Sequence, residues 1–154
     1  MRIIAHRGNI CGPEPGRENT LTQIKKCLDL GLDVEIDVRV RNNKLWLGHD
    51  SYNKTTNEGF LFDIRENLWI HCKNFEALKF FSEKNDSYNY FWHNKDSYTL
   101  TSKLYFWSYP DSKLFSNCIC VMPEWNMDIN SIKNLKNQNI AGICTDYPSL
   151  LLND

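Results

Sequence analysis

The chain has 154 residues, a formal net charge of −1, and 42% hydrophobic and 24% charged residues, which predicts one globular domain over residues 1–154 with a substantial core. The near-neutral charge supplies no basic field for nucleic-acid binding. No apolar stretch approaches the ~20 residues that a membrane-spanning helix needs.

The first thirty residues predict a strand, a loop and a helix. Residues 2–5 are apolar and predict a short strand, whereas residues 9–17 contain proline and glycine and predict a loop. Thr20 and Gln23 have the spacing of a capping box. Apolar residues then recur at helical spacing, and Gly31 stands where a helix ends.

Residues 33–40 alternate strictly between apolar and charged side chains, which predicts a strand with two different faces. Asn42-Asn43 predicts a tight turn into a partner strand at residues 45–47.

The rest of the chain continues to alternate between strands and helices. Strands are expected at residues 68–72, 90–92, 104–107, 118–122 and 140–144, and helices at residues 76–84 and after Asp128. This order favours a parallel α/β sheet. Seven of the expected strands are of the barrel type, and the strand at residues 45–47 lies outside this set.

Two connections in this second half are short. Residues 92–104 and 107–118 leave no room for the crossover helix of a dozen or more residues that parallel strands usually need. We expect one helical turn or an irregular loop in each. The uncovered outer face of the strands would be shielded by aromatic side chains or by a second subunit, so a homodimer is one expectation.

The six cysteines form no CxxC pair, which argues against a structural zinc site. Cys118 and Cys120 alternate with apolar residues and predict a buried strand. We expect reduced core thiols. The motif that begins at His6 leaves no room for a targeting segment before it, so a cytoplasmic location is expected.

Three short motifs carry the chemistry. They are His6-Arg7-Gly8, Glu35-Ile36-Asp37 and Gly48-His49-Asp50. Two carboxylates two residues apart project from the same face of a strand, and hard oxygen ligands bind Mg²⁺ or Ca²⁺. Taken alone, the same alternation also fits a solvated edge strand. Together, the motifs suit a divalent cation held against a phosphate.

These motifs, together with Glu18-Asn19-Thr20 and the ending Gly142-Ile143-Cys144-Thr145-Asp146-Tyr147-Pro148, resemble the glycerophosphodiester phosphodiesterase family. The resemblance is dense in the first third of the chain and returns in its last dozen residues, while the middle matches poorly. The family fold is a TIM barrel of about 250 residues. The resemblance therefore implies a reduced TIM-type (β/α) barrel with mostly parallel strands and some missing or shortened outer helices.

The resemblance implies that Glu35 and Asp37 ligate a divalent metal ion. Relatives carry a glutamate as third ligand two residues before a lysine, where this chain has His71. An imidazole ligand would shift the preference from Mg²⁺ or Ca²⁺ toward Mn²⁺, Co²⁺ or Zn²⁺. Alternatively, the change weakens or abolishes the site. Glu124 could restore a carboxylate, or it could be an ordinary loop residue.

His6 and His49 are the expected proton-transfer pair, because histidine titrates near neutrality. Arg7 and Lys73 are expected to bind the substrate phosphate. Glu18 either holds Arg7 in place or lies in the first turn of a helix.

The leading hypothesis is a metal-dependent hydrolase of glycerophosphodiesters or a related small phosphodiester. A catalytically lapsed phosphate-binding or regulatory module is the alternative, and a lyase that stops at the cyclic phosphate is a third. The sequence leaves the alcohol part of the substrate open. Trp92, Trp107, Tyr109 and Trp125 either stack on it or pack in the core and rim.

Overall fold

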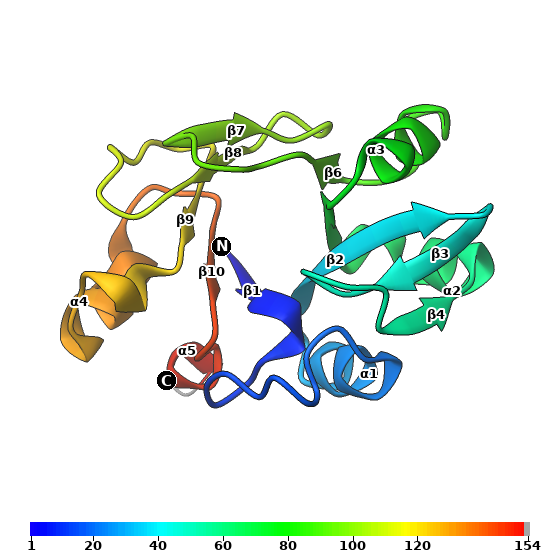
Figure 1. Cartoon of the computed structure of the whole chain (residues 1–154). Coiled ribbons are helices and arrows are strands. Elements are labelled where there is room, and N and C mark those ends of the chain that lie inside the picture. Colours follow the sequence, from blue (N-terminus) through cyan, green and yellow to red (C-terminus); the bar gives the residue numbers. More distant parts are fainter. Residues whose placement is uncertain (153–154) are drawn as a thin grey trace.

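The computed structural model describes residues 1–152, in which strands surround a central space and helices lie outside them (Figure 1). Parallel pairing joins neighbouring strands in the order β6-β5-β2-β1-β10-β9-β8. These strands are β1 (Arg2–Ala5), β2 (Asp33–Arg41), β5 (Leu68–Cys72), β6 (Tyr90–Phe91), β8 (Phe106–Ser108), β9 (Cys118–Val121) and β10 (Gly142–Thr145). The mixed α/β fold and its seven parallel strands confirm the prediction from the sequence pattern.

Three further strands are antiparallel. β3 (Lys44–Leu47) pairs with β2, and β4 (Lys54–Thr56) pairs with β3, so these two extend one end of β2. β7 (Tyr98–Leu100) pairs with β8. Within residues 1–152, strand pairing ends at β6 and at β7, and across this gap the Ser102 amide donates to the Tyr90 carbonyl at 2.9 Å. Strand pairing therefore does not close the sheet, and a loop contact links β6 to the residues after β7.

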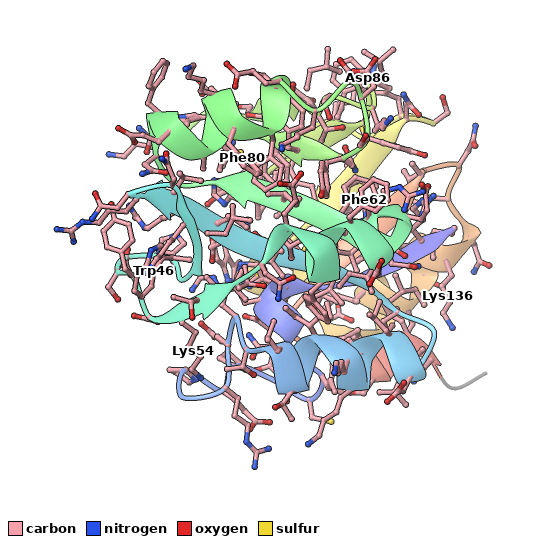
Figure 2. The ribbon with its side chains drawn as sticks, turned by 90° about the vertical axis from the view of Figure 1, so that its right-hand side faces the viewer. Trp46, Lys54, Phe62, Phe80, Asp86 and Lys136 are labelled. Carbon is pink, nitrogen blue, oxygen red and sulfur yellow. The ribbon has the colours of Figure 1, made fainter. Side chains whose placement is uncertain are left out.

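The outer layer is incomplete, as the short connections predicted. The helices are α1 (Leu21–Asp29), α2 (Glu58–Asp63), α3 (Phe75–Ser82), α4 (Ile129–Asn134) and α5 (Ser149–Leu152). In the described chain no helix lies between β6 and β8 or between β8 and β9. Figure 2 shows α1, α2 and α3 together on one side of the sheet.

Local sequence fixes the ends of several helices. The Thr20 hydroxyl accepts from the Gln23 amide at 3.2 Å, which confirms the predicted cap of α1. Asp128 caps α4 in the same way. The sequence pattern did not reveal α2, which Asn57 caps. None of the helices in residues 1–152 is long and apolar enough to cross a membrane.

The alternation of β2 sends its two sets of side chains to opposite sides. Val34, Ile36 and Val38 pack outward with residues of α1 and α3, so Glu35 and Asp37 point into the ring. Burial of this apolar row fixes the register, since a slip of one residue would exchange the two faces. The outer core therefore positions the carboxylates.

Aromatic rings fill much of the interior. Ring centroids are 5.0 Å apart for Tyr105 and Trp69, 5.9 Å for Trp69 and Trp107, and 4.6 Å for Trp107 and Phe91. Phe91 then stacks on His71 at 5.0 Å. We call these five rings the aromatic column. They form a packed core inside the strands, as in a barrel interior.

The six cysteines are free, and only Cys11 is exposed. Burial raises the pKa of Cys27, Cys72 and Cys120 to about 12. These thiols are protonated and apolar at neutral pH, which agrees with the expected core role.

Candidate active site

The candidate site lies at the ends of β1 and β5 and beside the middle of β2. The 3-10 turn η1 (His6–Gly8) follows β1 directly, while Glu35 and Asp37 lie within β2. Asp37 is the register partner of His71 in β5. Adjacent parallel strands thus bring residues that are far apart in sequence to the same edge of the sheet.

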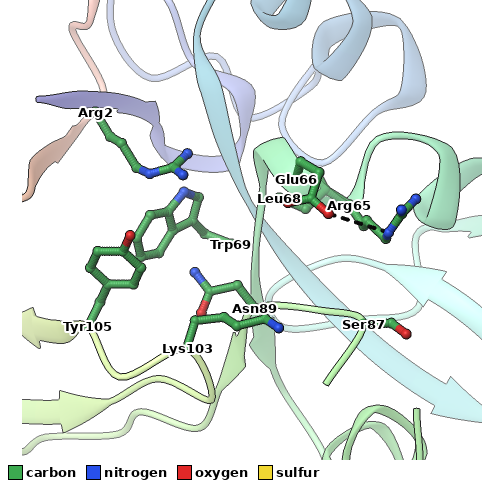
Figure 3. Close-up of a pocket in the computed structure, with 9 residues that line it drawn as sticks. All are labelled: Arg2, Arg65, Glu66, Leu68, Trp69, Ser87, Asn89, Lys103 and Tyr105. Carbon is green, nitrogen blue, oxygen red and sulfur yellow. Dashed lines mark ion pairs between the residues drawn. The ribbon is translucent and has the colours of Figure 1, made fainter. Parts of the chain in front are cut away.

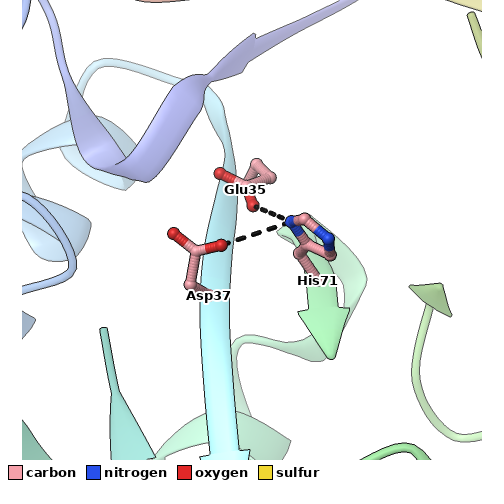
Figure 4. A group of neighbouring side chains, drawn as sticks. All are labelled: Glu35, Asp37 and His71. Carbon is pink, nitrogen blue, oxygen red and sulfur yellow. Dashed lines mark ion pairs between the residues drawn. The ribbon is translucent and has the colours of Figure 1, made fainter. Parts of the chain in front are cut away.

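Glu35, Asp37 and His71 converge on one point inside the ring (Figure 4). His71 Nδ1 lies 3.2 Å from Asp37 Oδ1 and 3.7 Å from Glu35 Oε1. One ligand atom from each residue lies within 4.8 Å of the others. The two carboxylate side chains are 2% and 0% exposed. Two buried acids at this separation need a counter-charge.

The orientation of His71 is fixed from the other side of its ring. Nε2 lies 3.0 Å from the carbonyl oxygen of His93. Because a carbonyl can only accept a hydrogen bond, Nε2 carries the hydrogen and Nδ1 faces the carboxylates. A histidine that ligates a metal commonly donates its second N–H to such a carbonyl.

Each carboxylate turns its second oxygen toward donors of the protein. Asp37 Oδ2 accepts from Asn19 Nδ2 at 2.9 Å and lies 3.1 Å from Arg7 Nε. Glu35 Oε2 accepts from the Arg7 amide at 3.0 Å. The inner oxygen of Asp37, Oδ1, is buried and accepts no hydrogen bond from residues 1–152. An orphaned buried carboxylate oxygen that faces an imidazole nitrogen suits a bound cation.

The two acids differ in their protonation. Burial raises the pKa of Glu35, and the neighbouring charge of Asp37 raises it further. Burial also works to raise the pKa of Asp37, but the facing His71 and the charges of Arg7 and His49 outweigh it, so that pKa is lowered. The Asp37 carboxylate is thus ionised, and its negative charge disfavours ionisation of Glu35. A cation between them would remove this conflict.

His6 lies between two acids. Its Nδ1 is 2.7 Å from Asp146 Oδ1, and its Nε2 is 4.0 Å from Glu35 Oε2. Burial works to lower the pKa of His6, but the hydrogen bond to Asp146 and the charges of Glu35 and Asp146 raise it above the ordinary value. Asn9 Nδ2 also donates to Asp146 Oδ1, at 2.7 Å.

Glu124 supports this arrangement and lies outside the metal-ligand cluster of the described residues. Its Oε1 accepts from the Asp146 amide at 2.7 Å. Glu124 therefore helps to hold Asp146, and Asp146 in turn holds His6. Among the described residues Glu124 does not join the metal-ligand cluster, which was one of the two roles that the sequence left open for it.

His49 reaches the site from the loop after β3. The Gly48 amide donates to the Asp37 carbonyl at 3.0 Å and ties this loop to β2. His49 Nε2 lies 3.1 Å from Lys73 Nζ, and the His49 and His71 rings are 6.4 Å apart. Burial and the charges of Arg7 and Lys73 lower the pKa of His49, against the opposing charge of Asp37. The two imidazoles are therefore shifted in opposite directions, as in an acid and base pair.

Arg7 is held in a left-handed backbone conformation, with φ of 53°. Its NH1 lies 3.3 Å from Glu18 Oε2, in addition to the contact with Asp37. Glu18 precedes α1 and contacts Arg7 and Asn9, so it acts as a holding group and not as a residue in the helix. All seven site residues predicted from the sequence thus lie around one centre.

Sequence reasoning did not assign roles to Asn19, His93 or Asp146. Asn19 and Asp146 stand inside the motifs that carried the resemblance, so a signal for them was present. His93 contributes through its carbonyl oxygen, which leaves no mark in the sequence. Of the aromatic candidates, Trp107 is buried in the core, whereas Trp92 and Trp125 are 45% and 55% exposed.

No protein-family model and no curated protein match the sequence. The structure is similar to a glycerophosphodiester phosphodiesterase from Agrobacterium tumefaciens, at 15% identity and a TM-score of 0.62, over 99% of each chain. It is also similar to a glycerophosphoryl diester phosphodiesterase from Parabacteroides distasonis, at 13% identity and a TM-score of 0.59, over 97% of this chain and 84% of that one. At identities this low, the two structural similarities establish a shared fold alone.

Proposed function

We propose that the protein is a phosphodiester hydrolase that acts on glycerophosphodiesters or a related small phosphodiester. The observation that carries the proposal is the convergence of Asp37 Oδ1, Glu35 Oε1 and His71 Nδ1 on one point. Beside it stand His6 and His49, whose pKa values are shifted in opposite directions. The similar fold of two solved phosphodiesterases supports the same reaction class.

Glu35, Asp37 and His71 would hold the cofactor, a divalent metal ion. When bound, the ion would neutralise charge on the phosphate oxygens and orient the ester. The donor set of two carboxylates and one imidazole suits Mn²⁺, Co²⁺ or Zn²⁺ better than an all-oxygen set would.

The two imidazoles would move the protons. His49, with its lowered pKa, is neutral near pH 7 and accepts the proton of the attacking glycerol hydroxyl. His6, with its raised pKa, carries the proton that the departing alcohol needs. The new O–P bond forms as the bond to the alcohol breaks, which gives a cyclic phosphate. Water then opens the cyclic phosphate with the two roles reversed.

Lys73 and Arg7 would stabilise the negative charge that develops on the phosphate oxygens. Lys73 lies beside His49 at 3.1 Å, so its ammonium group is near the proposed base. Arg7 already faces Asp37 and Glu18, and its remaining N–H groups are available to a phosphate.

The test is turnover of glycerophosphocholine, which carries the attacking glycerol hydroxyl, with Mg²⁺, Ca²⁺, Mn²⁺, Co²⁺ or Zn²⁺. We expect metal-dependent activity that His6→Ala and Glu35→Ala abolish. Glu83→Ala, which removes an exposed carboxylate on the outside of the fold, serves as the control and keeps the activity. Phosphorus NMR of the product distinguishes full hydrolysis from release of a cyclic phosphate.

Absence of turnover with all five metals would remove the proposal. If a metal still raised the melting temperature, the chain would be a lapsed module that binds the ion without the chemistry.

A further inference from the structure

A cavity lies at the other end of the strands from the candidate active site. Arg2 begins β1, Trp69 lies near the start of β5, and Asn89 and Tyr105 stand just before β6 and β8. These residues line a cavity of about 340 Å³, within the size range of small-molecule sites. Figure 3 shows Arg2, Trp69 and Tyr105 on one side of it and Asn89 with Lys103 beside them.

The lining carries an excess of positive charge. Arg2, Arg65 and Lys103 face the cavity, against a single acidic residue in the lining, Glu66. Arg65 pairs with Glu66 at 3.5 Å, and Arg2 pairs with the buried Asp33 at 2.7 Å.

Lys103, unlike Arg2 and Arg65, has no acidic partner among residues 1–152. Its ammonium group donates to the Asp86 carbonyl, which carries no charge, and Lys103 is absent from the ion pairs found among residues 1–152. The uncompensated charge of the cavity therefore belongs to Lys103, and it favours an anionic ligand.

Asn89 supplies a second, independent observation. This residue is only 9% exposed, and its side-chain oxygen is buried without a hydrogen-bond partner. That oxygen is closed to solvent, so a ligand in the cavity reaches it only when the Asn89 side chain turns toward the space that it lines. A carboxamide offers both a donor and an acceptor. It therefore suits a hydroxyl group on the ligand.

Hydrogen bonds hold the side chains on one side of the cavity in place. The Asp33 carboxylate accepts from Arg2 at 2.7 Å, from Asn67 at 3.0 Å and from Trp69 Nε1 at 3.1 Å. The Arg2 guanidinium in turn lies 6.0 Å from the centre of the Trp69 ring. The neighbouring groups are thus satisfied, while the Asn89 amide oxygen is not.

We propose that this cavity is a binding site for a small hydroxylated organic anion. Lys103 supplies the positive charge that attracts its phosphate or carboxylate group, and the Asn89 amide hydrogen-bonds to its hydroxyl. The site is separate from the candidate active site and does not depend on the activity proposed there.

The test is a titration of the full-length protein followed by nitrogen–proton NMR, with the Trp69 indole N–H and the Asn89 amide as reporters. Glycerol 3-phosphate and glycerate are the anionic probes, and glycerol is the neutral control. We expect saturable shifts of both reporters with at least one anion and none with glycerol. The probe with the lower Kd shows whether the cavity prefers a phosphate or a carboxylate group. Unmoved reporters with both anions at 20 mM, or equal shifts with glycerol, would overturn the proposal.

Single substitutions test whether the anion binds in this cavity. Asn89→Leu removes an amide that makes no hydrogen bond in the fold, so we expect an undiminished melting temperature and at least tenfold weaker binding. Lys103→Met, at an exposed position, should weaken binding similarly. Lys79→Met removes an exposed lysine that pairs with Glu83 and should leave Kd unchanged. Unchanged affinity in Lys103→Met would refute the site even if Asn89→Leu failed to fold.

Phosphate compounds could also occupy the candidate active site, so the titration is repeated in Lys73→Met. The shifts of Trp69 and Asn89 should persist there with the same Kd. Loss of both shifts in that variant would mean that the anion binds at the other end, and the proposal would fail.

Discussion

The imidazole of His71 donates through Nε2 to the main-chain carbonyl of His93 at 3.0 Å. Because the acceptor belongs to the backbone, the side chain at position 93 is not needed for this bond. The tautomer of His71 is therefore set by the pairing of β5 with β6, in which His71 is the register partner of Phe91. The fold itself turns Nδ1 of His71 toward Glu35 and Asp37.

The metal preference should follow from that nitrogen. We expect the parent protein to bind Mn²⁺ or Zn²⁺ at least ~10-fold more tightly than Mg²⁺. His71→Glu should narrow this ratio, because it offers a third carboxylate. Calorimetric titration with each metal measures the change. His93→Ala is the control and should keep the parent preference, since it retains the main-chain carbonyl. If His71→Glu showed the same metal preference as the parent protein, the proposed role of His71 would be contradicted.

The pH–rate profile should depend on Asp146. Activity requires neutral His49 and protonated His6, so it falls below the lowered pKa of His49 and above the raised pKa of His6. Asp146→Asn removes the anion that helps raise the pKa of His6. The basic limb should then move to lower pH by about one unit, as measured by kcat/KM between pH 5 and 9.

The complementary variant is Asp50→Asn. Asp50 helps to raise the pKa of His49 through a hydrogen bond at 2.7 Å, so its loss should move the acidic limb to lower pH and leave the basic limb in place. A basic limb that stays in place in Asp146→Asn would show that His6 is not the acid.

The loop that carries His49 depends on Gly48. This residue has φ of +147°, and an added Cβ would overlap the Ser51 carbonyl oxygen. Gly48→Ala should lower the free energy of unfolding by about 1–3 kcal/mol and reduce kcat by displacing His49. Chemical denaturation gives the first quantity. Gly16→Ala is the matched control, because its Cβ would meet no atom within 4 Å.

Thiol accessibility provides a test of the core. Cys11 is the one exposed cysteine of the six, and all six are free. An aromatic disulfide reagent should react quickly with one thiol in the native protein and with six in denaturant. Rapid reaction of a second thiol in the native state would mean that the interior is more open than described.

The sequence predicted the elements whose two sides carry different kinds of side chain. The alternation from Val34 to Val38 revealed β2, and it also fixed which way Glu35 and Asp37 point. The capping pair of Thr20 and Gln23 revealed the start of α1. These signals are local, so a reader of the chain finds them without knowing the rest of the fold.

The parts that escaped prediction depend on distant or main-chain groups. The strands β4 and β7 have three residues each, too few to show a period. Asp37 is held by Asn19 through both its side chain and its amide, a pairing that spacing does not suggest. The cavity beside Asn89 collects residues from the starts of several strands, so it exists only in the assembled ring.

The first strand lies in the middle of the sheet, between β2 and β10, and His6 meets Asp146 across 140 positions of sequence. During synthesis, β1 therefore leaves the ribosome long before its neighbour β10 does. A nascent chain that ends before residue 142 would hold both carboxylates and most of the outer helices, yet His6 would have no anchor. Maturation of the centre should thus be abrupt, arriving with β10.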